Sequence, residues 1–226
     1  MDYKTCDIAK MIDHSILKPE AGLSDLEKGC KTAMKYKTAF VCVKPCDVPY
    51  TKEFLSGSRV GVAAVVGFPH GSSPVEVKVY ETESLIRSGA DEIDAVVNFG
   101  RLLSGGEGYV ADEIRTLTDV THKHGKIIKV IFETCYLNDE LIEKLCRMCN
   151  AAGVDFVKTS TGFGSRGASV EDIITMRKYC DPAIQIKASG GIRTLGDMLT
   201  MIRLGVKRIG TSSTEDIMKE AVKSGI

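Results

Sequence analysis

Two lysines at the ends of apolar stretches are the first candidates for chemistry. Lys158 lies in DFVKTSTGF (155–163) and Lys187 in IQIKASGG (184–191). A neutral lysine amine attacks a carbonyl carbon, but an ordinary lysine, with a pKa of about 10.4, is almost entirely charged at pH 7. Burial and a neighbouring ammonium group both disfavour the charged form. We therefore interpret Lys158 as a nucleophile and Lys187 as the positive charge that favours its neutral state.

An acidic residue completes this set. An imine formed on a lysine withdraws electrons, so that a carbon–carbon bond beta to it can break or form, and a carboxylate such as Asp94 in EIDAVV can move the protons through water. Strand alternation places Asp94 and Asn98 on one face, and likewise Lys158 with Ser160. A structural ion-pair network, or lysines that reach outward to solvent, is the alternative interpretation. Other polar residues in or after the expected strands are Asp13, Ser15, Lys129 and Glu133.

Glycine and hydroxyl residues follow the last three expected strands. They are Thr161 and Gly162, then Gly190 and Gly191, then residues 210–213. Barrels commonly bind phosphate in the loops after strands seven and eight, where backbone N–H groups face the anion. Turns favour the same residue types, so one such piece is weak evidence. Three in succession predict a phosphate site.

These residues are positioned by short apolar strands that alternate with segments of helical periodicity. Eight strand and helix units predict a TIM (β/α)8 barrel with a short extra N-terminal helix, forming a single domain over residues 1–226. An open doubly wound sheet is the alternative, but the first joint, ILKPEAGLS (16–24), lacks the glycine fingerprint of a dinucleotide site. The expected strands are 11–17, 38–43, 60–68, 92–99, 126–133, 155–160, 184–190 and 208–213.

Composition restricts the partners and the compartment. With 30 basic and 30 acidic residues the net charge is zero, which offers no general attraction to nucleic acid or to an anionic membrane. The longest apolar run, VGVAAVVGF (60–68), is well short of the ~20 residues that span a bilayer. The N-terminal segment lacks the apolar core of a secretory signal, so we expect a cytoplasmic protein.

The eight cysteines are expected to be free thiols in a reducing compartment. Cys146 and Cys149, taken with Cys42 and Cys46, form a conceivable four-thiolate zinc site. The two pairs lie in different units of the chain, which favours core-filling thiols and no metal.

At this point the motifs resemble a known family. DEIDAVVNFG, KVIFETCYL, DFVKTSTGFG and IKASGGIRT, with MIDHSILKP before them and GFPHG in the middle, are similar to the deoxyribose-phosphate aldolases over nearly the whole chain. The resemblance implies a TIM barrel and a class I aldolase that needs no metal or other cofactor. It also implies reversible cleavage of a sugar phosphate, 2-deoxy-D-ribose 5-phosphate, to acetaldehyde and D-glyceraldehyde 3-phosphate in deoxyribonucleotide catabolism.

The resemblance also implies roles for individual residues. Lys158 matches the Schiff-base lysine, Lys187 the second active-site lysine and Asp94 the proton-relaying aspartate. His70 belongs to a motif in which shaping a loop is at least as reasonable as catalysis. The expected phosphate contacts are Gly162, Gly190, Gly191, Ser212 and Ser213, and the positions that line the sugar pocket are Asp13, Ser15 and Cys42. For Cys42, a plain core role is an equal alternative.

Three departures accompany the resemblance. Phe163 stands where some members carry a lysine, Ser15 stands where threonine is common, and the chain ends in KSGI where some members end in a tyrosine. A homodimer is the expected assembly. The alternatives to the implied activity are another lysine-dependent barrel aldolase, of the transaldolase kind, and an inactive barrel that only binds phosphorylated metabolites.

Overall fold

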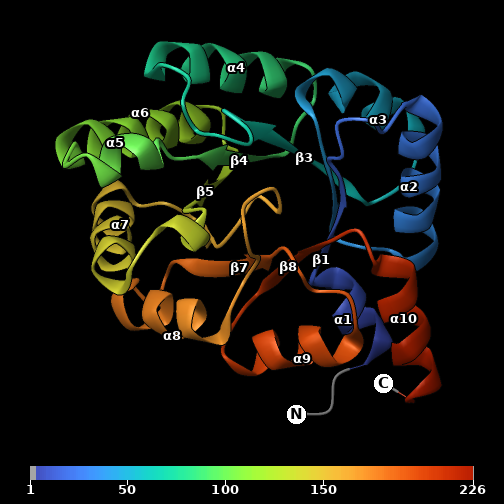
Figure 1. The fold of residues 1–226 in the computed structure, drawn as a ribbon. Coiled ribbons are helices and arrows are strands. Elements are labelled where there is room, and N and C mark those ends of the chain that lie inside the picture. Colours follow the sequence, from blue (N-terminus) through green and yellow to red (C-terminus); the bar gives the residue numbers. More distant parts are fainter. Residues whose placement is uncertain (1–3, 226) are drawn as a thin grey trace.

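The computed structural model describes residues 4–225, and in them eight parallel strands close into a barrel (Figure 1). Each strand pairs with the next along the chain, and β8 pairs with β1. The predicted TIM barrel is confirmed, and each expected strand is present with shorter ends. The strands are β1 Ile12–Ile16, β2 Phe40–Val43, β3 Gly61–Val66, β4 Glu92–Val96, β5 Ile127–Ile131, β6 Phe156–Lys158, β7 Gln185–Ser189 and β8 Arg208–Thr211.

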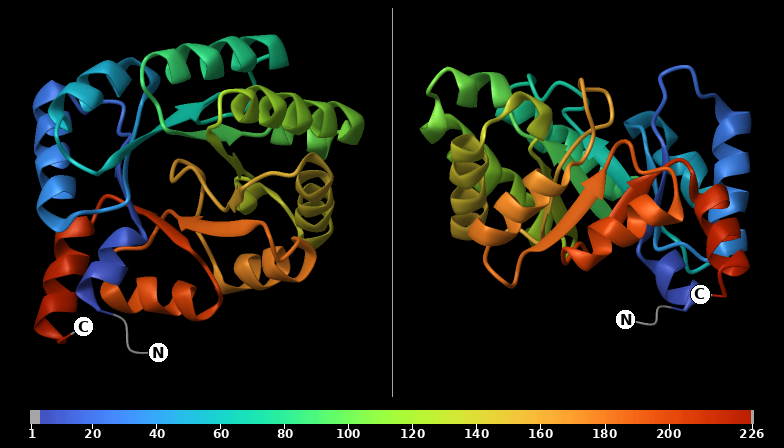
Figure 2. Two further views of the ribbon diagram at one scale, coloured as in Figure 1. Left: turned by 180° about the vertical axis from the view of Figure 1, so that it is seen from behind. Right: turned by 60° about the horizontal axis from the view of Figure 1, so that its bottom comes forward.

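Helices surround the barrel on all sides, as the two views of Figure 2 show. The predicted extra N-terminal helix is α1, Thr5–Lys10, which packs against the C-terminal helix α10. The others are α2 Leu23–Tyr36, α3 Val48–Phe54, α4 Val75–Arg87, α5 Phe99–Leu103, α6 Glu107–Lys123, α7 Asp139–Ala152, α8 Val170–Tyr179, α9 Leu195–Arg203 and α10 Thr214–Lys223, with 3₁₀ turns η1 Pro45–Asp47 and η2 Thr134–Tyr136. Among these helices of the described chain, none combines the length and apolar character that crossing a bilayer requires.

Two apolar clusters follow from the alternation of side chains along the strands. Residues that point outward, such as Ile93 and Ala95 of β4, pack under the helices in a large continuous core. A small cluster of Cys42, Ala63 and Val65 lies separately from it, on the inward faces of β2 and β3. The remaining inward positions are largely polar or charged, so burial of the outer faces holds the barrel together and leaves its interior for charged groups.

Candidate active site

Four charged residues lie in pairs on neighbouring strands. Asp94 of β4 is the register partner of Lys129 on β5, and Lys158 of β6 is the register partner of Lys187 on β7. Parallel register partners point to the same face of a sheet, so all four side chains enter the barrel. Each is at most 2% exposed. The convergence of charges that strand alternation predicted is therefore observed.

Asp94 is the shared acceptor of the lysines. Its Oδ2 accepts hydrogen bonds from Lys158 Nζ and Lys187 Nζ, each at 2.8 Å, and its Oδ1 accepts one from Lys129 Nζ at 2.6 Å. Burial raises the pKa of Asp94, but the three ammonium groups outweigh burial and hold the pKa well below its usual value of 3.8. Asp94 is therefore a carboxylate at neutral pH.

Lys187 has a second carboxylate partner. Its ammonium group donates to Asp13 as well as to Asp94, while Asp13 also accepts a hydrogen bond from Arg208 at 2.8 Å. Burial lowers the pKa of Lys187, but the carboxylates of Asp13 and Asp94 outweigh burial and raise it above its usual value. Lys187 thus remains positively charged inside the barrel.

Lys158 differs from the other two lysines in its position. Asp94 is its single ion-pair partner within the described residues. Of the three lysines around Asp94, Lys158 is the one that lines a cleft of about 330 Å³ above the barrel. Within this cluster it is thus the lysine that a molecule in the cleft can reach.

The same cleft is lined by all five residues expected to bind phosphate. Gly162, with a φ of 90°, and Gly190 and Gly191, each with a φ of 79°, adopt left-handed conformations that turn the backbone toward the cleft. Ser212 and Ser213 lie at the start of α10, where Ser213 is the N-cap residue.

Four of the five residues expected to bind phosphate have an unpaired backbone N–H group. Within residues 4–225, the N–H groups of Gly162, Gly190, Gly191 and Ser212 donate to no protein acceptor. Backbone N–H groups are strong donors that are nearly always paired when buried, and several of them grouped near a helix N-terminus are typical of an anion site. The lining therefore suits a phosphate group.

Two basic residues on the cleft lining were not identified in the sequence. Lys18 follows β1 and Arg193 follows β7, and both are exposed at the edge of the cleft. The available signal was the presence of a basic residue shortly after a strand end. Phe163 packs edge-on against Phe68 with ring centroids 5.4 Å apart.

The remaining predicted pocket residues lie around Asp94 and the cleft. Ser15 lines the cleft, and Asp13 lies below it against Lys187. Cys42 is fully buried with its Sγ 3.9 Å from Asp94 Oδ2, and burial raises the pKa of its thiol. His70 is exposed in the turn after the cis Phe68–Pro69 peptide and is not among the residues that line the cleft.

One expectation about the strands is wrong. Asn98 does not share the inner face of β4 with Asp94, because the strand ends at Val96. The side-chain oxygen of Asn98 instead accepts a hydrogen bond from Arg101 N–H and caps α5. Asparagine competes effectively for a helix N-terminus, which explains why the strand stops before it.

Two charged residues of the barrel floor were also missed. Glu92 of β4 accepts a hydrogen bond from Arg208 of β8 at 3.2 Å and pairs with Lys129. The Arg208 guanidinium lies over the ring of Phe40, 4.8 Å from its centroid. Strand alternation alone could have flagged both, because each lies two residues from, or in register with, an inward-pointing charge.

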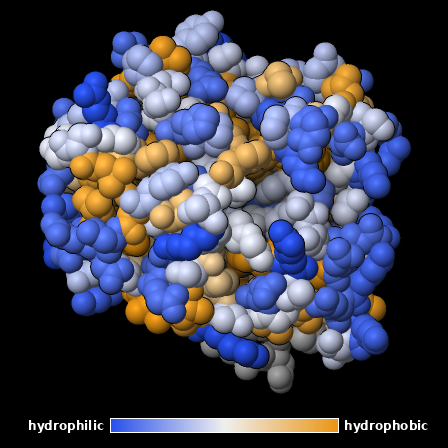
Figure 3. Space-filling view, viewed as in Figure 1, coloured by the Kyte–Doolittle hydropathy of each residue, from blue (hydrophilic) through white to orange (hydrophobic). Residues whose placement is uncertain are grey.

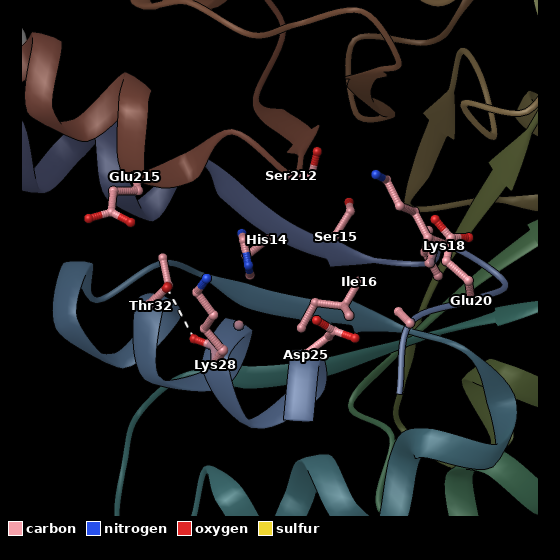
Figure 4. A pocket seen from close by; sticks show the side chains of 13 residues that line it. His14, Ser15, Ile16, Lys18, Glu20, Asp25, Lys28, Thr32, Ser212 and Glu215 are labelled. Carbon is pink, nitrogen blue, oxygen red and sulfur yellow. Dashed lines mark hydrogen bonds between the residues drawn. The ribbon is translucent and has the colours of Figure 1, made fainter. Parts of the chain in front are cut away.

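A second pocket, of about 380 Å³, adjoins the cleft between β1, α2 and α10 (Figure 4). The two share Ser15, Leu17, Lys18 and Ser212, and the two hydroxyl groups lie in the upper part of that view, near the Lys18 amine. His14 lines this pocket, its Nδ1 lies 2.9 Å from Thr214 Oγ1, and burial lowers its pKa to about 4.

The space-filling view shows hydrophilic side chains bordering the hollow in the middle of the molecule (Figure 3).

The cysteines are distributed over separate regions. Cys42 lies inside the barrel, Cys46 is exposed, and Cys146 and Cys149 lie on the buried face of α7. The zinc alternative required these four thiols to lie together, and the structure separates them. Within the described residues, no group of three or more His, Cys, Asp or Glu side chains is arranged to hold a metal ion.

The chain was compared with known proteins. A deoxyribose-phosphate aldolase of Treponema denticola is 48% identical over 207 residues, which cover 92% of this chain and 96% of the relative. One of Thermococcus gammatolerans is 49% identical over 217 residues, which cover 95% and 96%.

Solved structures are similar as well. The aldolase QR15 has a TM-score of 0.90 at 37% identity and covers 96% of both chains. A tetrameric deoxyribose phosphate aldolase from Aeropyrum pernix has a TM-score of 0.90 at 30% identity, covering 99% of this chain and 94% of its own. Residues 1–219 also match the sequence pattern of the DeoC/LacD family of aldolases. The chain therefore belongs to the DeoC/LacD aldolase family.

Proposed function

We propose that this protein is a class I aldolase that reversibly cleaves 2-deoxy-D-ribose 5-phosphate to acetaldehyde and D-glyceraldehyde 3-phosphate. One observation carries the proposal: the amine of Lys158 and the four unpaired N–H groups border the same cleft. A single sugar phosphate can thus place its carbonyl carbon at the amine and its phosphate among the N–H groups. The names of the relatives point to the same substrate.

The reaction proceeds through covalent intermediates on Lys158. The neutral amine adds to the C1 carbonyl of the open-chain sugar, and the carbinolamine loses water to give an iminium ion. Removal of the proton from the C3 hydroxyl then breaks the C2–C3 bond, because the iminium accepts the electron pair as an enamine. Glyceraldehyde 3-phosphate leaves, the enamine is protonated at carbon, and hydrolysis releases acetaldehyde and restores the amine.

Asp94 is placed to move protons during these steps. It hydrogen bonds to Lys158, and it accepts and returns protons through water at the C3 hydroxyl and at the carbinolamine. Because its pKa lies well below the usual value, the protonated carboxyl exists only transiently. Some relatives carry a C-terminal tyrosine for proton transfer. This chain has Ile226 as its last residue, which lies outside the described residues.

Lys187 supplies a permanent positive charge beside the nucleophile. Its Nζ and that of Lys158 are each 2.8 Å from the same oxygen of Asp94, so the two nitrogens are at most twice that distance apart. A fixed ammonium group this close disfavours a second positive charge on Lys158. Asp13 and Asp94 hold Lys187 in the charged form that this role requires.

The phosphate is held by Gly162, Gly190, Gly191, Ser212 and Ser213. Lys18 and Arg193, which line the same cleft, supply positive charge in place of the lysine that Phe163 replaces. Ser15, which lines the cleft, shapes the space around the sugar between the two ends of the substrate, and Cys42 is buried against Asp94.

Trapping with borohydride tests the covalent step. Incubation with acetaldehyde and sodium borohydride should convert the imine into N-ethyl-lysine at Lys158, identified by peptide mass mapping. The Lys158→Met variant should remain unlabelled under the same conditions. Labelling confined to other lysines would contradict the assignment, labelling by dihydroxyacetone instead of acetaldehyde would favour a transaldolase-like enzyme, and no labelling would favour a barrel that only binds.

Further features are proposed from family membership. Residues 1–226 form one aldolase domain, which acts as a homodimer in the cytoplasm during deoxyribonucleotide breakdown. The tetramer of the Aeropyrum pernix relative shows that larger assemblies occur among similar proteins. Light scattering after gel filtration measures the mass of the assembly in solution, and a mass of twice 24.5 kDa is expected.

A further inference from the structure

Glu133 is a buried acid that the proposed reaction does not use. It follows β5, and its side chain is 2% exposed. Its backbone has a φ of 45°, in the left-handed region that residues other than glycine seldom adopt. A residue held in such a conformation is often constrained by a function, so its contacts are informative.

The carboxylate of Glu133 holds the first residue of the phosphate turn by two donors. Its Oε1 accepts a hydrogen bond from Thr161 N–H at 3.2 Å, and its Oε2 accepts a short one from the Thr161 hydroxyl. The Thr161 Oγ1 in turn accepts a hydrogen bond from Phe163 N–H at 3.0 Å. Because the hydroxyl is the hydrogen-bond donor toward Glu133, its oxygen can serve as the acceptor for Phe163 N–H.

In this arrangement the N–H groups of Thr161 and Phe163, on either side of Gly162, are hydrogen bonded, whereas the N–H group of Gly162 is not. The N–H of Gly162 donates to no acceptor within residues 4–225, and Gly162 lines the cleft. Glu133, which is not among the residues that line the cleft, therefore fixes the turn, and the donor that remains is the one available to an anion.

Glu133 is itself firmly held next to the strand that carries Lys158. Phe132 N–H donates to Lys158 O at 2.9 Å, and Thr134 N–H donates to Thr159 O at 3.0 Å. The Thr134 hydroxyl also donates to Asp172 at 2.9 Å. The end of the strand that carries Lys158 and the turn that begins at Thr161 are thus both hydrogen bonded to the segment around Glu133.

A purely structural role is a poor explanation for this acid. Within the described residues no cation pairs with Glu133, and a buried polar group is costly unless its hydrogen bonds are needed. Its side-chain oxygens accept hydrogen bonds from Thr161 and, at 3.9 Å, from the Cys135 thiol. Burial of an acidic side chain for the sake of this turn indicates that the conformation of the turn matters.

We propose that Glu133 is a positioning residue that sets the Thr161–Phe163 turn so that Gly162 N–H meets the phosphate of a phosphomonoester substrate. This inference rests on the proposed function and extends it to the preference for phosphorylated over unphosphorylated sugar.

The test compares two substrates in the Glu133→Gln variant. Glutamine preserves the shape of the side chain, but its amide NH2 group is a donor. It would donate to Thr161 Oγ1 and so reverse the direction of the hydrogen bond between the two side chains. The KM for 2-deoxyribose 5-phosphate should rise about 10-fold or more, the range expected for a lost hydrogen bond to a charged group. The kcat/KM for unphosphorylated 2-deoxyribose should change less than about two-fold.

Control variants separate positioning from stability. Thr161→Val should raise the KM as Glu133→Gln does, and the double variant should add little, because both act through one contact. Thr161→Ser keeps the hydroxyl and should resemble the wild type. Glu113→Gln, in another buried carboxylate remote from the cleft lining, should affect both substrates alike.

Equal losses for both substrates in Glu133→Gln, or an unchanged KM, would overturn the positioning role. Binding of inorganic phosphate, measured by calorimetry, tests it without turnover: the Kd should rise in the variant, and an unchanged Kd would contradict the inference. Absence of cleavage by the wild type would overturn the proposed function instead, so the two failures are distinguishable.

Discussion

Two buried ionic clusters in this molecule differ in a way that separates stability from chemistry. One is the pair Lys78–Glu113, which joins α4 to α6 outside the barrel. The Lys78 ammonium donates to Glu113 at 2.6 Å and to the carbonyl oxygens of Gly71 and Val96 at 2.7 Å each. Glu113 also accepts a hydrogen bond from Asn98 N–H at 2.8 Å. All three protons of this ammonium are used, and one positive charge meets one negative charge.

The other cluster surrounds Asp94 inside the barrel and is not balanced. It contains the cations Lys129, Lys158, Lys187 and Arg208 and the carboxylates Asp13, Glu92 and Asp94. If all are charged, one positive charge is in excess, and removal of the Lys158 amine would bring the charges into balance. This lysine is the one beside the cleft.

The pKa directions reflect the same contrast. Burial dominates in the isolated pair: it lowers the pKa of Lys78 and raises that of Glu113, despite their attraction. In the Asp94 cluster, attraction among several charges outweighs burial, so the pKa of Asp94 is lowered and that of Lys187 is raised. The isolated pair Lys78–Glu113 therefore joins helices and loops outside the barrel. The network around Asp94 instead contains one cation more than it has carboxylates.

The largest expected effect is the loss of the cleft lysine. Lys158→Met should lower kcat/KM for 2-deoxyribose 5-phosphate by at least about 10⁴-fold, as removal of a nucleophile does. Because the remaining charges balance, the melting temperature should stay the same or rise. A coupled assay and scanning calorimetry measure both, and a large loss of stability would show that Lys158 serves the fold.

The structural pair should show the opposite behaviour. Lys78→Met leaves Glu113 and two carbonyl oxygens without their donor, so the free energy of unfolding should fall by about 3–5 kcal/mol. Activity per folded molecule should stay within about two-fold. Lys52→Met, which removes an exposed ion pair with Asp91, serves as the control and should cost less than about 1 kcal/mol. Denaturant titration measures each value.

Replacing the second lysine should give an intermediate, pH-dependent effect. Lys187→Leu removes the fixed charge beside Lys158 and should lower kcat at neutral pH by about 10²-fold or more. Raising the pH should restore part of the rate, because alkaline solution supplies the neutral amine that Lys187 no longer favours. A pH–rate profile tests this, and wild-type activity at pH 7 would refute the electrostatic role.

The smallest effect is a difference in acid stability between the two clusters. The pKa of Asp13 is lowered below 3.8, so its ionised form stabilises the fold at neutral pH, and this contribution disappears as the pH falls below 3.8. The advantage of the wild type over Asp13→Asn should shrink there by up to about 1.4 kcal/mol per pH unit.

Glu113 should give the opposite sign. Its pKa is raised above 4.5, so its ionisation costs stability, and the wild type should gain relative to Glu113→Gln as the pH falls toward 4.5. Melting temperatures of both variants between pH 2 and 7 measure the two trends, and equal trends would remove the distinction between the clusters.

Local patterns were sufficient for the fold and for the main candidates. Each of the eight expected strands is present. Apolar runs of strand length and segments of helical periodicity depend on residues that are close together in the sequence, so they can be recognised without knowledge of the fold. The motifs around Lys158, Lys187 and Asp94 placed these residues on strands for the same reason, although only Lys158 lies at the end of its strand. The prediction for Asn98 was wrong because a helix cap competes locally with one more strand residue.

The sequence alone thus determined the order of the elements and the inward faces of Asp94, Lys158 and Lys187, since both follow from short-range periodicity. Only the tertiary structure decided their partners: Asp13 with Lys187 and Arg208, Glu133 with Thr161, and the cleft shared by Lys18 and Gly162. Strand alternation specifies a face but not a neighbour. Contacts between residues far apart in the sequence depend on closure of the barrel, which brings β1 beside β8 and lets the charges meet.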